Sequence, residues 1–282
     1  MCIRDRFNTH GIIKVGTGTW TLTSTTLSYT GLTTVSNGVL ALGASANLSA
    51  STPITIAAPG ILDVSASGTL TLAAQTIQGD GTLRGSLATG TGTTVSPGGA
   101  NAIATLTVTN DVNLQGTLVM ELNRTNSPAT NDLLVANTIE MGGTLQVNNL
   151  GPDLHTGDTF RLFSVPATGS FAVTNLPATT SSGSITYVWT NKLAIDGSIE
   201  VLLGVPNVST TPTNLVSSFD GVNLNLSWPA DHTGWRLQVQ TNTLGVGLSS
   251  NWVTVPGSTA VNQLAFPVSQ ANGTVFFRMI YP

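Results

Sequence analysis

The sequence predicts an all-β protein, made of a right-handed parallel β-helix followed by a small β-sandwich. Short segments of the pattern Gly-x-Leu-x-apolar recur through the first half of the 282-residue chain. Several of their glycines, at positions 18, 38, 60 and 81, lie 20 to 22 residues apart, which is a spacing typical of stacked repeat units. After residue 214, apolar and polar residues alternate in short runs broken by Gly, Pro and Asn, as in a sandwich.

The first six residues, Met-Cys-Ile-Arg-Asp-Arg, read as the translation of a transposase adapter end, so we expect residues 1–6 to be an artefact. Cys2 is then not native, and the remaining chain has no cysteine for disulfides, thiolate catalysis or thiolate metal ligation. We also expect the chain to be a fragment of a longer protein, with its signal peptide lost by truncation.

Residues 7–203 are predicted to form the β-helix and its closing cap. Within each coil, alternation points Leu, Ile and Val inward and Thr or Ser outward, while the backbone pairs with the coils above and below. A single coil cannot bury its apolar side chains alone, so stability must come from stacking, and Leu62 and Leu70 are expected core residues. From residue 111 to 203 the pattern loosens, which predicts wider final coils and a cap.

Residues 204–213 contain two prolines and no apolar periodicity, and they are predicted to be a linker. Residues 214–282 form the predicted sandwich. Its runs include Val222-Asn-Leu-Asn-Leu-Ser-Trp228, in which Trp228 shares the core face with Leu224 and Leu226.

The charge content excludes several classes of partner. Charged residues make up 8% of the chain, and the formal net charge is −4 with Lys and Arg scattered singly. No basic stripe is present to neutralise phosphates, so nucleic acid is not an expected partner. No apolar run is long enough for a membrane-spanning helix, so we expect no membrane insertion of this chain.

Part of the first half resembles a known repeat. The segments are Gly16-Thr-Gly-Thr-Trp-Thr-Leu22, Tyr29-Thr-Gly-Leu-Thr-Thr-Val35 and Gly38-Val-Leu-Ala-Leu-Gly43. Together they resemble one copy of the autotransporter-associated β-strand repeat, also called the passenger-associated transport repeat, although Leu27 and Ser28 depart from its usual Gly-x-Asn before Tyr-Thr-Gly. This resemblance implies a parallel β-helix and export to the outer-membrane surface or the medium, and it implies no ligand.

Two later stretches carry further resemblances. The part containing Met120-Glu-Leu-Asn and Gly157-Asp-Thr-Phe-Arg-Leu-Phe163 is similar to the tail that closes such repeat arrays. The C-terminal block resembles the fibronectin type III-like terminal domains of bacterial surface proteins, through Leu226-Ser-Trp-Pro, Gly234-Trp-Arg-Leu-Gln-Val-Gln-Thr-Asn242 and Phe276-Phe-Arg-Met.

Ionisable residues are too sparse to predict a catalytic, cofactor or metal site. His10, His155 and His232 are widely separated in loop-like positions and are expected to be solvated turn residues. The densest cluster, Asp153, His155 and Asp158 with Ser164 nearby, lacks a nucleophile motif and is predicted to be a turn.

Parallel β-helices can host polysaccharide lyases and glycosidases, whose chemistry needs paired carboxylates or basic residues. Before residue 110 the native acids are Asp63 and Asp80, and the native bases are Lys14 and Arg84. So few groups do not favour a catalytic cleft, although proximity of the two aspartates stays open.

Trp235 and Trp252 are the candidate ligand-binding residues, because an exposed indole can stack on a sugar ring. Packing in the sandwich is the favoured alternative for both. The sequence therefore predicts a non-enzymatic secreted or cell-surface structural protein, adhesin-like, whose partners are extracellular glycans or cell-surface components. The alternative is a carbohydrate-binding or polysaccharide-degrading β-helix protein.

Overall fold

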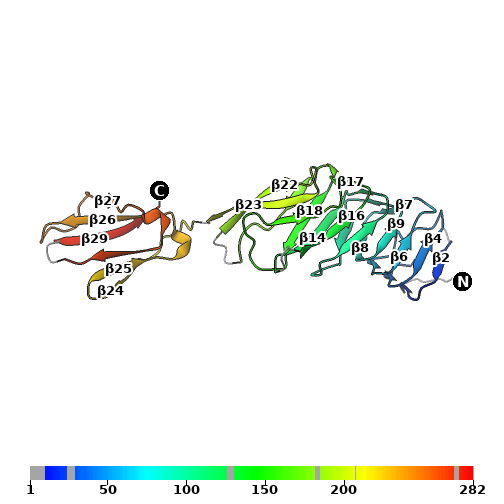
Figure 1. The fold of residues 1–282 in the computed structure, drawn as a ribbon, viewed down its shortest axis with the longest axis horizontal. Helices are drawn as coiled ribbons and strands as arrows, with labels where there is room; N and C mark the ends of the chain where they lie inside the picture. The colour runs from blue at the N-terminus through cyan, green and yellow to red at the C-terminus, as the bar shows by residue number, and fades with distance from the viewer. Residues whose placement is uncertain are drawn as a thin grey trace. The chain divides into compact units, whose positions relative to one another are not determined.

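The computed structural model describes residues 10–23, 29–125, 130–181, 185–206, 208–269 and 273–281. The chain divides into two compact units (Figure 1). Unit 1 comprises Met1–Ala178 and Tyr187–Leu203, and unit 2 comprises Thr179–Thr186 and Gly204–Pro282. The first is built on parallel strands and the second on antiparallel ones.

Unit 1 is a parallel β-helix with three sheets along its length (Figure 1). The chain visits the sheets in rotation, so each strand pairs in parallel with a strand one coil later. Sheet A consists of β1 (Ile12–Lys14), β3 (Thr33–Val35), β5 (Ile54–Ile56), β8 (Thr76–Gly79), β11 (Thr94–Pro97), β14 (Thr117–Asn123), β18 (Thr144–Asn149) and β21 (Val173–Asn175), with β15 (Thr130–Asn131) beside β14. Sheet B consists of β2 (Thr19–Leu22), β4 (Val39–Leu42), β6 (Ile61–Asp63), β9 (Thr82–Arg84), β12 (Thr105–Val108) and β16 (Leu133–Val135). Sheet C begins later, with β7 (Thr69–Leu72), β10 (Ser86–Thr89), β13 (Asp111–Asn113), β17 (Thr138–Met141) and β20 (Thr168–Gly169).

The register of sheet B explains the glycine spacing in the sequence. Gly18, Gly38, Gly60 and Gly81 each immediately precede a strand of this sheet. Leu40 lies opposite Leu62, and Leu62 lies opposite Leu83, so equivalent leucines stack one above another. All three are fully buried, and the predicted parallel β-helix with stacked inward leucines is confirmed.

Gly38 shows why a side chain is not tolerated at the start of β4. Its φ of 65° lies in the left-handed region that favours glycine. A Cβ there would also lie 2.4 Å from the carbonyl oxygen of Gly16 in the preceding coil. The coils therefore approach so closely at this turn that only a hydrogen fits.

The C-terminal end of unit 1 departs from the parallel pattern. Three strands form a separate sheet in the order β19 (Thr159–Arg161), β23 (Ser198–Pro206) and β22 (Ile185–Lys192), in which β19 and β23 are antiparallel. Phe160 and Ile199 oppose each other across β19 and β23, and both belong to the same buried core as the coils. A terminal element of this kind provides new partners for a stack that would otherwise end in exposed apolar side chains.

Unit 2 contains two antiparallel three-stranded sheets. One has the order β24 (Val216–Phe219), β25 (Asn223–Ser227), β28 (Gln263–Pro267), and the other has β27 (Val253–Thr254), β26 (Arg236–Asn242), β29 (Thr274–Ile280). Two short 3-10 helices, η1 (Ala230–His232) and η2 (Ser258–Ala260), lie between strands. Leu226, Trp228 and Leu237 are buried between the sheets, which places Trp228 in the core as its alternation predicts.

The stretch 204–213, predicted to be a linker, is divided in the structure. Residues 204–206 continue strand β23. Further on, the carbonyl oxygens of Ser209 and Thr211 accept hydrogen bonds from side chains of the sandwich. Residues 208–213 thus pack against the sandwich within unit 2.

Candidate functional site

Trp235 does not offer an open ring to a ligand. Its side chain is 5% exposed, and its indole nitrogen donates a hydrogen bond to the carbonyl oxygen of Ser209 at 2.7 Å. The ring centroid lies 5.0 Å from that of His232 and 5.5 Å from that of Tyr281. Trp235 is therefore enclosed by aromatic neighbours, and its geometry favours packing over sugar stacking.

Trp252 is the more accessible of the two tryptophans. It is half-buried and precedes β27, and the guanidinium carbon of Arg278 lies 4.2 Å from its ring centroid. Arg278 is held in turn by a hydrogen bond from its Nε to Oε1 of Gln238 at 2.9 Å. One ring face of Trp252 is thus covered by a cation, which strengthens the packing interpretation.

The two tryptophans do not form one platform. Trp235 precedes the first residue of β26, whereas the pairing of Val253 with Val239 places Trp252 near Gln240 of that strand. Five residues of extended strand separate these levels, a distance of about 17 Å. One sugar ring therefore cannot stack on both side chains.

His232 is buried, contrary to the solvated turn position expected for it. It is 4% exposed, and its two ring nitrogens contact the carboxylate of Asp231 and the carbonyl oxygen of Thr211, each at 2.7 Å. Burial opposes the charged imidazolium, but these two acceptors outweigh it and raise the pKa of His232. His232 therefore ties η1 to the segment before β24. His10 and His155 are exposed, as expected of turn histidines.

Asp63 and Asp80 are each engaged in local structure. Asp63 accepts hydrogen bonds from the backbone nitrogen and the hydroxyl of Ser65, and it forms an ion pair with Arg84 at 2.7 Å. Burial acts against its charge, but these donors lower its pKa. Asp80 accepts a hydrogen bond from the backbone nitrogen of Ala58 at 2.8 Å.

Lys14 was expected to be one of the few basic groups available for chemistry, but it is fully buried. Its ammonium donates hydrogen bonds to the carbonyl oxygens of Val15, Gly16 and Asn37, at 3.1, 2.6 and 2.9 Å. It also lies 5.5 Å from the ring centroid of Trp20. Lys14 thus joins the turns of two successive coils.

The cluster around His155 is a turn, and its members have separate partners. Asp158 accepts hydrogen bonds from the backbone nitrogen of His155 at 2.7 Å and from Nε of Arg124 at 2.8 Å. The hydroxyl of Ser164 instead contacts the backbone of Ala136. No serine–histidine hydrogen bond joins these two residues in the described structure, so the arrangement of a nucleophile and its base is not formed.

A pair of buried carboxyl groups lies inside unit 1, and no sequence motif indicated it. Asp132 is fully buried and Glu121 is 2% exposed. Asp132 accepts hydrogen bonds from the backbone nitrogens of Ala104 and Glu121, each at 2.7 Å. Burial, together with contact with Glu121, raises the pKa of Asp132. Oε2 of Glu121 has no hydrogen-bond partner among the described residues, and this pair is most simply a proton-sharing structural element.

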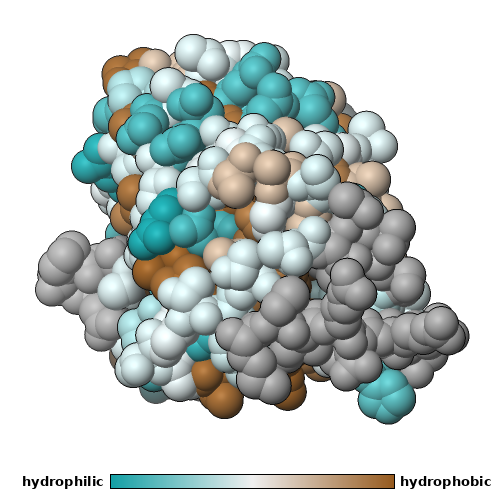
Figure 2. Space-filling model, turned by 90° about the vertical axis from the view of Figure 1, so that its right-hand side faces the viewer, coloured by the Kyte–Doolittle hydropathy of each residue, from teal (hydrophilic) through white to brown (hydrophobic). Residues whose placement is uncertain are grey.

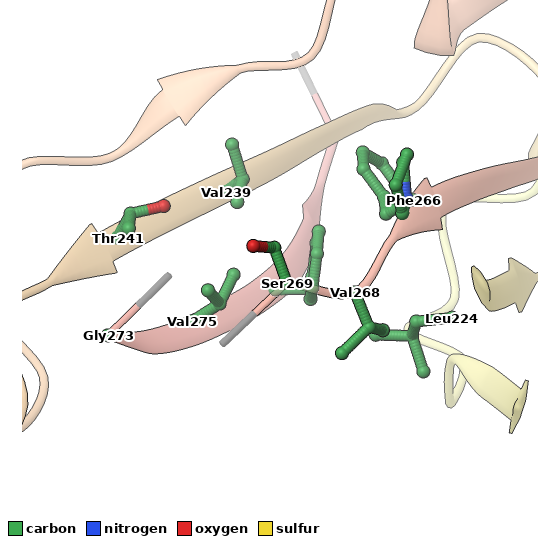
Figure 3. A pocket seen from close by; sticks show the side chains of 10 residues that line it. Leu224, Val239, Thr241, Phe266, Val268, Ser269, Gly273 and Val275 are labelled. Atoms are coloured by element: carbon green, nitrogen blue, oxygen red, sulfur yellow. The ribbon is translucent and has the colours of Figure 1, made fainter. Parts of the chain in front are cut away.

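Unit 2 contains a partly open pocket of about 420 Å³ between its sheets, lined mainly by apolar side chains. Figure 3 shows Leu224, Phe266 and Val268 on one side of it and Val239, Thr241 and Val275 on the other. The residues at the opposite end of the sandwich, including Trp228 and Leu237, are closely packed. The apolar packing of the sandwich is therefore incomplete at one end. The alternation of the strands predicted the core face but not how well it is filled.

On the face drawn in Figure 2, hydrophilic and near-neutral residues predominate, and hydrophobic ones appear in small separate groups. In the described part of the chain, no helix has both the length and the apolar character needed to cross a lipid bilayer. Among the same residues, no three His, Cys, Asp or Glu side chains gather as metal ligands.

Sequence comparison identifies one segment of the coil stack. Residues 12–42 match the passenger-associated-transport-repeat family. The matched segment contains β1, β2, β3 and β4, which are the strands that form the first parallel pairs of sheets A and B. The resemblance inferred from the glycine and leucine motifs is thus confirmed for this repeat. A search of curated proteins gave no match to the chain.

Proposed function

We propose that this chain is a non-enzymatic structural repeat protein of the autotransporter-passenger type, located at the cell surface or outside the cell. The observation that carries the proposal is the passenger-associated transport repeat at residues 12–42, which lies within a continuous stack of parallel coils. The candidate ionisable residues have structural partners: Asp63 is paired with Arg84, Asp80 with a backbone amide, and Lys14 with three carbonyls.

We further infer that the chain is part of a longer, adhesin-like polypeptide and that unit 2 is a fibronectin type III-like domain. Two packed antiparallel three-stranded sheets support this second inference, because domains of that class are antiparallel sandwiches. A neutral, hydroxyl-rich surface suits contact with glycans and other cell-surface components, which are uncharged or weakly charged partners.

Protease treatment of intact cells tests the location. Bacteria producing the protein are treated with a protease that cannot enter them, and the chain is followed with an antibody against unit 1. We expect the antibody signal to be lost from intact cells while a cytoplasmic control protein survives. A chain that is degraded only after lysis would contradict the proposal.

Binding and turnover measurements separate an adhesin from a carbohydrate-active enzyme. The full chain is applied to a glycan array and incubated with a panel of plant and algal polysaccharides. We expect binding without depolymerisation. Turnover that is lost in Asp63→Asn or Asp80→Asn would instead assign a polysaccharide-degrading activity. A binding signal unchanged in folded Trp252→Ala would remove that tryptophan from the binding surface.

A further inference from the structure

The fold brings the two arginines of unit 2 to one face of one sheet. From residue 204 to 282 the lysine and arginine residues of the sequence are Arg236 and Arg278. Arg236 lies on β26 and Arg278 on β29, which are antiparallel neighbours in the sheet of order β27-β26-β29 (Figure 1). Gln238 lies opposite Arg278, so Arg236 is a diagonal neighbour of Arg278, and such positions are about 7 to 8 Å apart. Leu237, which lies between Arg236 and Gln238, is fully buried, so the side with the arginines faces outward.

Neither arginine forms an ion pair with a carboxylate in the part of the chain that the structure describes. The three strands of the sheet contain no Asp or Glu. The two acidic residues of the same stretch of sequence have other partners: Asp220 accepts hydrogen bonds from the backbone of Val222 and Asn223, and Asp231 contacts His232. A positively charged surface without its own counter-charge is complementary to an anionic ligand.

Arg278 is exposed, and yet its guanidinium is held in place by neighbouring side chains. Its Nε donates a hydrogen bond to Oε1 of Gln238 at 2.9 Å, and Nε2 of Gln238 donates one to Oγ1 of Thr254 at 3.4 Å. These three side chains form one row across the sheet, because Gln238 pairs with both Arg278 and Thr254. The guanidinium carbon also lies 4.2 Å from the ring centroid of Trp252. The two terminal nitrogens of Arg278 donate no hydrogen bond to any described residue, so they are available to a ligand.

The chemistry of this face fits a carboxylate that is attached to a sugar. A planar guanidinium with two free nitrogens binds a carboxylate through two parallel hydrogen bonds. Because Gln238 and Trp252 already hold the guanidinium, little conformational freedom is lost on binding. The amide of Gln238 and the hydroxyl of Thr254 are groups that hydrogen-bond to sugar hydroxyls. Two arginines are too few to neutralise the closely spaced phosphates of a nucleic acid.

We propose that the outward face of the sheet β27-β26-β29 binds a carboxylated polysaccharide, a polymer that contains uronic acid residues. Arg278 is the principal contact to a carboxylate, and half-buried Arg236 adds a second positive charge beside it. Trp252 then acts as a positioning residue, because its indole supports the guanidinium instead of stacking on a sugar ring. This inference rests on the contact with extracellular glycans proposed above, and it adds the charge class of the glycan.

The test compares two ligands that have the same sugar backbone. The full chain is titrated with oligomers of galacturonic acid and with the same oligomers after methyl esterification, which removes the charge and keeps the ring hydroxyls. We expect the acid form to bind about tenfold more tightly, because the ester cannot form charge-assisted hydrogen bonds with Arg278. Raising the salt concentration should weaken binding of the acid form and leave binding of the ester unchanged.

Substitutions of Arg278 test its role directly. Arg278→Gln should weaken binding of the acid form about tenfold and leave binding of the ester unchanged. Arg278→Lys keeps the charge but loses the planar fork, so it should restore only part of the affinity. Arg84→Gln removes the same charge from an exposed ion pair in unit 1, and this matched control should bind like the unsubstituted protein. Calorimetry shows whether unit 2 is folded in each variant, and Arg278→Lys with the ester comparison decides the question if Arg278→Gln does not fold.

Three results would overturn the proposal. The first is equal binding of the acid and the ester in the unsubstituted protein and in Arg278→Gln, which would leave glycan contact in place and remove the selectivity for carboxylates. The second is no binding of either oligomer, and a glycan array that is also blank would then remove glycans from the proposed function. The third is equally tight, Arg278-dependent binding of polyglutamate, because that result would assign this face to an acidic polypeptide.

Discussion

Unit 1 of this chain buries its apolar residues more completely than unit 2 does. In unit 1 each new coil covers the one before it, and leucines such as Leu40, Leu62 and Leu83 are fully buried along the stack. In unit 2 two sheets of three strands each bury Leu226, Trp228 and Leu237, while the core-side Phe219 stays 60% exposed. Parallel stacking therefore completes its core with every repeat, whereas a sandwich depends on a full set of strands in both layers.

The largest expected effect is in the sandwich. Trp235→Ala should cost about 3 to 5 kcal/mol, because it removes a buried aromatic ring that packs against His232 and Tyr281. Trp252→Ala, at a half-buried site, should cost less. Calorimetry should show unit 2 lost or melting much earlier in Trp235→Ala, with the transition of unit 1 in place. Equal effects of the two substitutions would contradict the burial difference.

In unit 1, Leu62→Ala or Leu70→Ala should cost about 2 to 5 kcal/mol, through lost burial and a cavity in the stack. Leu32→Ala, at a position that is 40% exposed, is the matched control, with an expected change within about 0.5 kcal/mol. Denaturant unfolding followed by circular dichroism measures both. A negligible loss in Leu62→Ala would show that sheet B does not enclose a packed core.

A smaller loss of stability is expected where neighbouring coils approach each other closely. In Gly60→Ala the new Cβ would lie 2.3 Å from the carbonyl oxygen of Val35, so the coils must separate at a cost of about 1 to 3 kcal/mol. Gly18→Ala meets no atom within 4 Å and should be tolerated. The difference in melting temperature between the two variants measures the effect. Equal stability would mean that neighbouring coils are not in contact at Gly60.

The buried carboxyl pair predicts a pH dependence confined to unit 1. Because the folded-state pKa of Asp132 is raised, its contribution to stability is fully present below about pH 4 and is lost as pH rises toward that pKa. The free energy of unfolding should therefore fall as pH rises through this range. Urea unfolding between pH 5 and 7 should show this pH dependence of stability in the unsubstituted protein and in the control variant Glu140→Gln. The same pH dependence in Asp132→Asn would show that Asp132 is not its cause.

Alternation and glycine spacing were sufficient to predict the coils, since both depend on local chain geometry. The inward leucines and the core position of Trp228 follow from a period of two residues along a strand. The burial of Lys14 did not follow, because its hydrogen-bond partner Asn37 belongs to the next coil. The same holds for Asp132 and Ala104, which are joined across 28 residues of chain.

The tryptophans show the same limit at the candidate site. A local pattern cannot tell which indole face meets another segment, so Trp235 and Trp252 are equivalent in the sequence. In the structure Trp235 is enclosed by Tyr281 and by the segment containing Ser209, which are both remote in sequence. The uncovered Phe219 is likewise a property of sheet order rather than of the residues around it.

Spin-label distances along sheet B test the stacked-coil account most directly. Six outward-facing residues of sheet B lie opposite one another on successive strands: Thr19, Val39, Ile61, Thr82, Thr107 and Val135. With Cys2→Ser as background, one label at Thr19 and a second at Thr82, Thr107 or Val135 should give separations that grow by about 4.8 Å per coil. Distances that fail to increase in this order, as antiparallel hairpins or separate sheets would produce, would contradict the β-helix.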